Sequence, residues 1–270
     1  MNNININKLI DTHAHLDFPD LYPRIDEVIA NAKLNNVYKI ITISTNLSKI
    51  DKIIKISEDN SQVFFTVGVH PNEVNKDKNY LNYDLIKKIS EHPKCVGIGE
   101  GGLDYHYGLG SKSNQIASFV TQINVARDTN LPLVIHSRDA DKDMIEILKN
   151  EFKNGPFNAI LHCFSSGESL AKCGVDLGFF VSFSGIVTFK SAKNIQEIAR
   201  KLPIDRILVE TDSPYLAPNP YRGKINEPKN CLYVAKFLSD LKSLDFNQFS
   251  EILYNNSIKV FYKIPIWEQL

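Results

Sequence analysis

The chain has 270 residues, of which 43% are hydrophobic and 23% charged, and this balance excludes fibrous and disordered classes of protein. A length of 270 residues suits one large domain or two small ones. Lys and Arg total 31 and Asp and Glu total 31, so the overall charge argues neither for nor against a nucleic-acid partner.

Short runs of β-branched and apolar residues predict eight strands. In chain order these are Leu9–Ile10, Tyr38–Ile43, Val63–Val69, Val96–Ile98, Leu133–Ile135, Ala159–Leu161, Phe179–Phe183 and Arg206–Val209. Apolar residues at helical spacing lie between them, as at Ile25/Val28/Ile29/Ala32, Ile116/Phe119/Val120/Ile123 and Met144/Ile145/Leu148. Two further helices are predicted to close the chain, from Pro228 to about Leu241 and from Phe246 to about Tyr262.

This alternation of strands and helices predicts an α/β protein with a single-domain (β/α)8 TIM barrel. The runs are almost continuously apolar, as parallel strands covered on both faces require. A doubly wound sheet is the alternative, but no Gly-x-Gly-x-x-Gly follows the first strand. No linker divides the chain, so we expect one domain over residues 1–270, with the barrel over about 8–262.

Histidines and carboxylates follow the predicted ends of six strands. They are His13 and His15, His70, Glu100, His136, His162 and Asp212. The carboxyl ends of barrel strands converge on one face, which is where active sites lie. Five of the 7 histidines occupy these ends, and a histidine placed for packing has no reason to favour them.

These residues predict a binuclear metal site at the carboxyl face of the strands. His13 and His15 lie two apart, so their side chains point the same way and can chelate an ion. In isolation such a pair is equally well explained by hydrogen-bonded barrel residues. With His136, His162, Glu100 and Asp212, the set suits two divalent ions, and the sequence does not decide among Zn²⁺, Mn²⁺ and Mg²⁺.

The carboxylates are predicted to divide the roles at this site. Glu100 is the natural bridge, because a carboxylate can join two cations and a neutral imidazole cannot. Asp212 lies near the first ion; a helix N-cap is the alternative, since Ser213 and Pro214 follow it. Glu210 lies on the same strand face and would orient a ligand from behind, with an ion pair inside the barrel as its alternative.

Seven segments, in order, resemble the successive motifs of TatD-type metal-dependent deoxyribonucleases of the amidohydrolase superfamily. They are Ile10–Asp17, Val67–Pro71, Gly97–Tyr105, Leu133–Asp139, Leu161–Phe164, Phe183–Phe189 and Leu208–Leu216. The resemblance implies a metal-dependent hydrolase on a (β/α)8 barrel that degrades DNA, often from the 3′ end of a single strand. It also implies that His13, His15, Glu100, His136, His162 and Asp212 are metal ligands, and that His70 and Glu210 belong to the site.

One residue departs from the family pattern. Gly101 stands where these enzymes usually carry Thr, Cys or an aliphatic residue after the bridging Glu. We expect the glycine to loosen that loop without removing a ligand.

Phosphodiester hydrolysis assigns further roles. We expect Asp212 to act as general base and His70 to donate a hydrogen bond to the phosphate. Candidate phosphate contacts are Arg138, Arg222 and Lys224, where Arg222 and Lys224 form an Arg-Gly-Lys segment that also resembles the family. Tyr105, together with other loop aromatics, is a candidate for stacking on unpaired bases. Surface solvation and rim packing are the alternatives for these side chains.

Two other functions stay open. An amide, ester or small-phosphodiester hydrolase of the same superfamily is the first, although several of these bridge their ions with a carboxylated lysine. The fourth strand reads Val96-Gly-Ile-Gly-Glu100 and has no lysine. A non-catalytic metal-binding protein is the second, but six ligands for two ions leave open coordination positions, as in catalytic sites.

The predicted setting is a monomer in the cytoplasm that meets single-stranded DNA ends and no membrane. The first residues lack the basic and apolar segments of a secretory signal. The most apolar stretch, Leu177 to Phe189, is interrupted by glycine and serine and is shorter than the roughly 20 residues of a membrane helix. Four scattered cysteines fit buried reduced thiols better than a disulfide framework.

Overall fold

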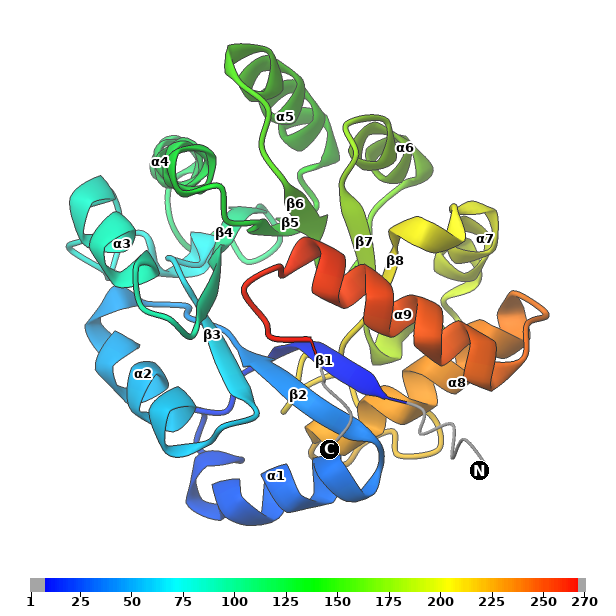
Figure 1. The fold of residues 1–270 in the computed structure, drawn as a ribbon. Coiled ribbons are helices and arrows are strands. Elements are labelled where there is room, and N and C mark those ends of the chain that lie inside the picture. Colours follow the sequence, from blue (N-terminus) through cyan, green and yellow to red (C-terminus); the bar gives the residue numbers. More distant parts are fainter. Residues whose placement is uncertain (1–7, 267–270) are drawn as a thin grey trace.

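Eight parallel strands form one sheet in the order β1-β2-β3-β4-β5-β6-β7-β8 in the computed structural model, which describes residues 8–266. The strands are β1 Leu9–Ala14, β2 Val37–Thr42, β3 Val63–Val67, β4 Cys95–Asp104, β5 Leu133–Arg138, β6 Ala159–Leu161, β7 Phe180–Phe183 and β8 Ile207–Val209. Helices surround the rolled sheet (Figure 1). The predicted TIM barrel is therefore confirmed, and each predicted strand has its counterpart.

The helices follow the strands around the outside of the barrel. They are α1 Ile25–Leu34, α2 Ile50–Asp59, α3 Tyr83–Ser90, α4 Lys112–Thr129, α5 Asp141–Asn154, α6 Glu168–Asp176, α7 Lys193–Lys201, α8 Cys231–Leu241 and α9 Phe246–Val260. Side-chain caps define several starts: Ser111 accepts from the backbone N–H of Asn114, and Asp245 accepts from those of Asn247 and Gln248. Such caps each stabilise a helix start by about 1 kcal/mol.

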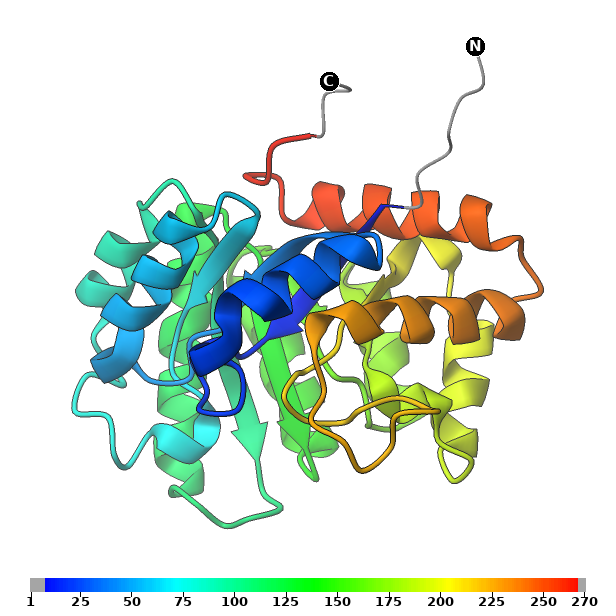
Figure 2. The ribbon, with the colours of Figure 1, turned by 90° about the horizontal axis from the view of Figure 1, so that it is seen from below.

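Helix α9 lies across the amino end of the barrel (Figures 1 and 2). Phe261 and Ile264, just after this helix, are each 1% exposed and join an apolar cluster with Ile10, Val96 and Leu208 from the strands. A second and larger apolar cluster fills the layer between strands and helices. The amino end of the barrel is thus closed by packed side chains.

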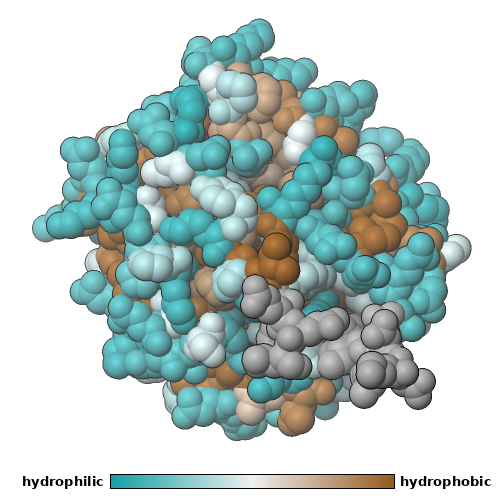
Figure 3. Space-filling model, in the orientation of Figure 1, coloured by the Kyte–Doolittle hydropathy of each residue, from teal (hydrophilic) through white to brown (hydrophobic). Residues whose placement is uncertain are grey.

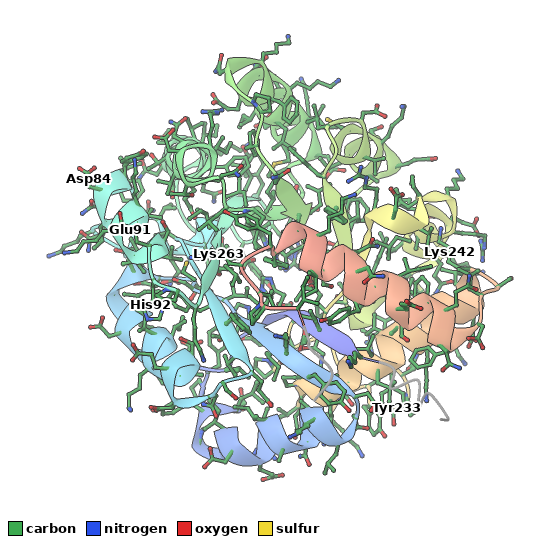
Figure 4. All side chains as sticks on the ribbon, viewed as in Figure 1. Asp84, Glu91, His92, Tyr233, Lys242 and Lys263 are labelled. Carbon is green, nitrogen blue, oxygen red and sulfur yellow. The ribbon has the colours of Figure 1, made fainter. Side chains whose placement is uncertain are left out.

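Around this closed end, two lysines donate hydrogen bonds to backbone carbonyls at the ends of helices. Lys263 Nζ donates to the carbonyl oxygens of His92 at 2.9 Å and Ser90 at 3.4 Å, which joins the segment after α9 to the end of α3 (Figure 4). Lys242 Nζ likewise donates to the carbonyls of Arg200 and Leu202, which are left without helical partners at the end of α7. The surface of this face is mainly hydrophilic, with small apolar patches (Figure 3).

At the seam between β1 and β8, hydrogen bonds near the carboxyl end join the first strand to the last and close the sheet into a barrel. The backbone N–H of Asp212 donates to the carbonyl of His13 at 2.9 Å, and that of His15 donates to Ser213 at 2.8 Å. Asp11 accepts from both the N–H and the hydroxyl of Thr211, at 2.9 and 2.6 Å, and burial raises the pKa of Asp11 to about 8. The seam therefore holds His13, His15 and Asp212 in fixed positions.

Strand β4 is longer than the sequence indicates, and this corrects the expected position of Glu100. The strand continues past Ile98 to Asp104, so Glu100 lies inside it rather than after it. Gly102 permits this course: its φ is +141°, and an added Cβ would lie 2.0 Å from the carbonyl oxygen of His136. Gly101 is part of the buried strand, with Gln122 against it, so the expected loosening of a loop is wrong.

Among residues 8–266, no helix combines the length and the apolar character needed to cross a membrane.

Candidate metal centre

A cavity of about 1220 Å³ opens among residues at the carboxyl ends of the strands. These strand ends lie on the side of the barrel opposite α9 (Figure 2). Its wall includes most of the residues predicted from strand ends, namely His15, His70, Glu100, His136, His162 and Asp212. His13 lies directly beneath them and is fully buried. Side chains from at least five strands or strand ends therefore meet at one place.

Glu100 occupies the middle of the cluster and is 2% exposed. Its Oε1 lies 2.6 Å from His162 Nε2 and 2.9 Å from His136 Nδ1. Its Oε2 faces the other way, 3.4 Å from His13 Nε2. Each oxygen thus faces a different set of imidazoles, which is the arrangement that a carboxylate bridging two cations needs.

The first set consists of His13, His15 and Asp212. Asp212 Oδ1 lies 3.4 Å from His15 Nε2 and 3.6 Å from His13 Nε2. Both ring nitrogens of His13 and the Nδ1 of His15 are buried without a hydrogen-bond partner. A buried polar atom left without a partner lowers the stability of the fold by about 1–3 kcal/mol, and a bound cation would remove this cost by using these nitrogens as ligands.

The second set consists of His136 and His162, each backed by a carboxylate. Glu210 Oε1 lies 3.2 Å from His162 Nδ1 and accepts from the backbone N–H of Cys163 at 2.7 Å. Asp104 Oδ2 lies 3.1 Å from His136 Nε2. In both cases the second ring nitrogen is left facing Glu100, as in metal sites whose histidines are oriented from behind.

The electrostatics of the cluster demand positive charge. Burial opposes ionisation of Glu100, but His162, His70 and His13 outweigh it and hold the pKa of Glu100 well below its usual value. Burial likewise opposes protonation of His162, yet Glu100 and Glu210 raise the pKa of His162 well above its usual value. Glu100 and Glu210 therefore favour a proton on His162, in the place where a divalent cation would supply the same charge.

The donor set fits such cations. Four groups of side chains present ligand atoms that lie within 4.8 Å of one another, and three of them belong to these two sets: His13/His15/Glu100, His13/His162/Asp212 and Glu100/His136/His162. Imidazoles mixed with carboxylates suit Zn²⁺, Mn²⁺ and related ions. The described residues can therefore hold divalent metal at this end of the barrel.

His70 adds a neutral group to the cavity wall. Its Nδ1 accepts from the backbone N–H of Asn72 at 3.0 Å, and its Nε2 lies 3.6 Å from Glu100 Oε1. Burial lowers the pKa of His70 to about 3, so the ring is uncharged at neutral pH.

The predicted substrate contacts are placed unequally. Arg138 lines the cavity, with its guanidinium 4.8 Å from the ring centroid of Tyr107. Tyr105 instead donates its hydroxyl to Asp143 at 2.8 Å and does not line the cavity. Arg222 lies 3.6 Å from the ring centroid of Phe189 and Lys224 lies 5.9 Å from that of Tyr221, and the cavity wall includes neither cation.

Asp104 is a site residue that strand-end reasoning missed. It belongs to the Gly97–Tyr105 segment, but a strand ending at Ile98 places it in a loop. In β4 as it is, Glu100 and Asp104 both lie inside the strand, and both contact the ring of His136. Its position four residues after Glu100, twice the two-residue period of a strand, was therefore the signal that could have found it.

Comparison with known proteins supports the same assignment. The family described as "TatD related DNase" matches residues 10–262. The chain belongs to this family. A TatD relative in Bacillus subtilis, "Uncharacterized metal-dependent hydrolase YabD", is 38% identical over 94% of this chain and 98% of its own. "Uncharacterized metal-dependent hydrolase YcfH" of Escherichia coli (strain K12) is 37% identical over 94% and 96% of the two chains.

Solved structures agree with the TatD assignment. The TatD homologue YJJV from Escherichia coli has a TM-score of 0.87 at 25% identity, covering 97% of this chain and all of its own. A lactonase of Deinococcus radiodurans, at 11% identity and a TM-score of 0.67, shares the fold alone. The chain is a TatD-family metal-dependent hydrolase.

Proposed function

We propose that this hydrolase is a deoxyribonuclease that holds two divalent ions and removes nucleotides from the 3′ end of single-stranded DNA. The observation that carries the proposal is the position of Glu100 between two sets of imidazoles, with Asp212 beside the first. The description of the matching family as DNase supports the choice of substrate. The monomeric state and the cytoplasmic setting predicted from the sequence belong to the same proposal.

The residues of the cluster can be given separate roles in the hydrolysis of a phosphodiester. His13, His15 and Asp212 would hold one ion and His136 and His162 the other, with Glu100 shared between them. Bound divalent ions supply Lewis acidity and offset the charge of the phosphate. In the reaction, an oxygen of water forms a bond to phosphorus while the bond to the leaving 3′-oxygen breaks, and that oxygen gains a proton.

Asp212 is placed to take the proton of the attacking water. Its side chain is 15% exposed and lines the cavity, whereas Glu100 and Glu210 are almost completely enclosed. Burial opposes its ionisation, but His15 and His13 lower the pKa of Asp212, so it is a carboxylate at neutral pH. His70 can donate Nε2–H to a phosphate oxygen, and Arg138 can meet the phosphate from the rim.

The test is release of nucleotides from a 3′-labelled single-stranded DNA oligomer by metal-stripped protein given back Zn²⁺, Mn²⁺ or Mg²⁺. We expect ion-dependent shortening in the wild type. Asp212→Asn should lower turnover by about 10²–10⁴-fold, the usual contribution of a general base, while much of the metal stays bound. Asp205→Asn is the matched control, because Asp205 is 63% exposed and lies at the opposite end of β8.

Each part of the proposal has its own contrary result. A fully active Asp212→Asn enzyme would remove Asp212 from the role of general base. No cleavage with any ion, despite bound metal, would contradict the nuclease assignment. Panels of amides, esters and small phosphodiesters would then identify which other hydrolase of the superfamily the protein is.

A further inference from the structure

A hydrogen-bond network joins Asp104, Asn72, His70 and His136 beside the metal centre. The rings of His70 and His136 lie in edge-to-face contact, with centroids 4.5 Å apart. With Asp104 they present ligand atoms within 4.8 Å of one another. This group is either a further cation site or a support that orients the two histidines, and the partners of each atom distinguish the two.

Asp104 has no acceptor position left for a cation. Its Oδ2 accepts from His136 Nε2 at 3.1 Å and from Asn72 Nδ2 at 3.0 Å. Its Oδ1 accepts from the backbone N–H groups of His106 at 3.0 Å and Tyr107 at 3.4 Å. A carboxylate offers about four lone-pair positions, and all four are occupied. The group is therefore a support for the histidines.

The contact with Asp104 determines which nitrogen of His136 can bind a cation. Because an ionised carboxylate only accepts, Nε2 of His136 must be the N–H. Nδ1 lies 2.9 Å from Glu100 Oε1 and 3.4 Å from His162 Nε2, and it is the ring nitrogen that Asp104 leaves available to a cation. His136 thus directs its remaining ligand nitrogen toward the centre of the cluster.

His70 is held in the opposite role. The backbone N–H of Asn72 donates to its Nδ1 at 3.0 Å, so the lone pair of that nitrogen is already used. The hydrogen of the neutral ring lies on Nε2, the atom that faces Glu100. Asn72 therefore acts on both histidines, through its backbone on His70 and through its side-chain amide on Asp104.

We infer that Asp104 and Asn72 are positioning residues that give two adjacent histidines different functions. His136 is held as a metal ligand through Nδ1, and His70 is held as a hydrogen-bond donor through Nε2–H. The inference rests on the proposed function for the identity of the ion and for the anionic oxygen that His70 meets.

The first test uses the wild-type protein with ¹⁵N-labelled histidine side chains, at a pH where the rings are neutral. In the metal-free protein, Nε2 should carry a hydrogen in both His70 and His136. On addition of Zn²⁺, the Nδ1 resonance of His136 should shift as a ligand, while His70 should keep its Nε2–H. Ligation of the ion by His70 Nε2 would overturn the inference.

The second test is Asp104→Asn. An asparagine brings one NH₂ group into a place where four donors converge, so the amide must face either His136 or the backbone of residues 106–107. We expect it to reverse the tautomer of His136 and to weaken Zn²⁺ or Mn²⁺ binding by about 10–100-fold, as loss of such outer partners does. Asp143→Asn is the control, because Asp143 accepts from Tyr105 and touches neither histidine.

The outcomes separate this inference from the proposed function. An unchanged His136 tautomer and unchanged metal affinity in Asp104→Asn would overturn it and leave Asp104 as an anchor of residues 106–107. A wild type that binds metal and shows these tautomers but cleaves no DNA would contradict the proposed substrate and leave the positioning roles intact.

Discussion

The two ends of the barrel interior are built from the same eight strands and have opposite chemistry. At the amino end, Phe261 and Ile264 close the barrel against apolar strand residues. At the carboxyl end, Glu100 and four imidazoles crowd together with buried nitrogens that have no partner. Packing at the amino end therefore stabilises a barrel that can tolerate a costly polar cluster at the carboxyl end.

The largest expected effect on stability lies at the amino end. Phe261→Ala should lower the free energy of unfolding by about 3–5 kcal/mol, because it empties a fully enclosed site. Chemical denaturation measures the loss, and metal affinity per folded molecule should stay the same. Tyr262→Ala, a neighbouring residue that is 49% exposed, is the control and should cost far less. Reduced metal affinity in folded Phe261→Ala would show that the two ends are coupled.

A smaller effect on stability is expected from removal of metal at the carboxyl end. An ion that binds only the folded protein stabilises it by about 2.7 kcal/mol at a concentration 100 times its Kd. Chelation should therefore lower the melting temperature of the wild type and of Phe261→Ala by similar amounts. A melting temperature that chelation leaves unchanged would contradict the view that the carboxyl end is completed by metal.

The sequence predicts the fold and the cluster well because both depend on short spacings. Apolar runs identify strands. Because all strands of a parallel barrel end at the same face, a histidine or carboxylate that follows such a run must lie at that face. The positions of His13 and His15 could be predicted in this way. Glu210 could be assigned to the same face, since it follows β8 directly.

Other features could not be predicted, because they depend on contacts between distant residues. The length of β4 follows from the fit of Gly101 and Gly102 against Gln122 and the backbone of His136, which no local pattern reveals. The role of Asp104 depends on Asn72 and His136, which are 32 residues away on either side. Arg222 could be placed on a loop, but its contact with the ring of Phe189 is visible only in the fold.

Glu100 joins the imidazoles of the carboxyl end around divalent metal. Elemental analysis of dialysed wild type and Glu100→Gln, after both are loaded with Zn²⁺ or Mn²⁺, tests it most directly. We expect two ions per wild-type chain and a clear loss of bound metal in folded Glu100→Gln. Equal metal content in the two proteins, or none in the wild type, would contradict it.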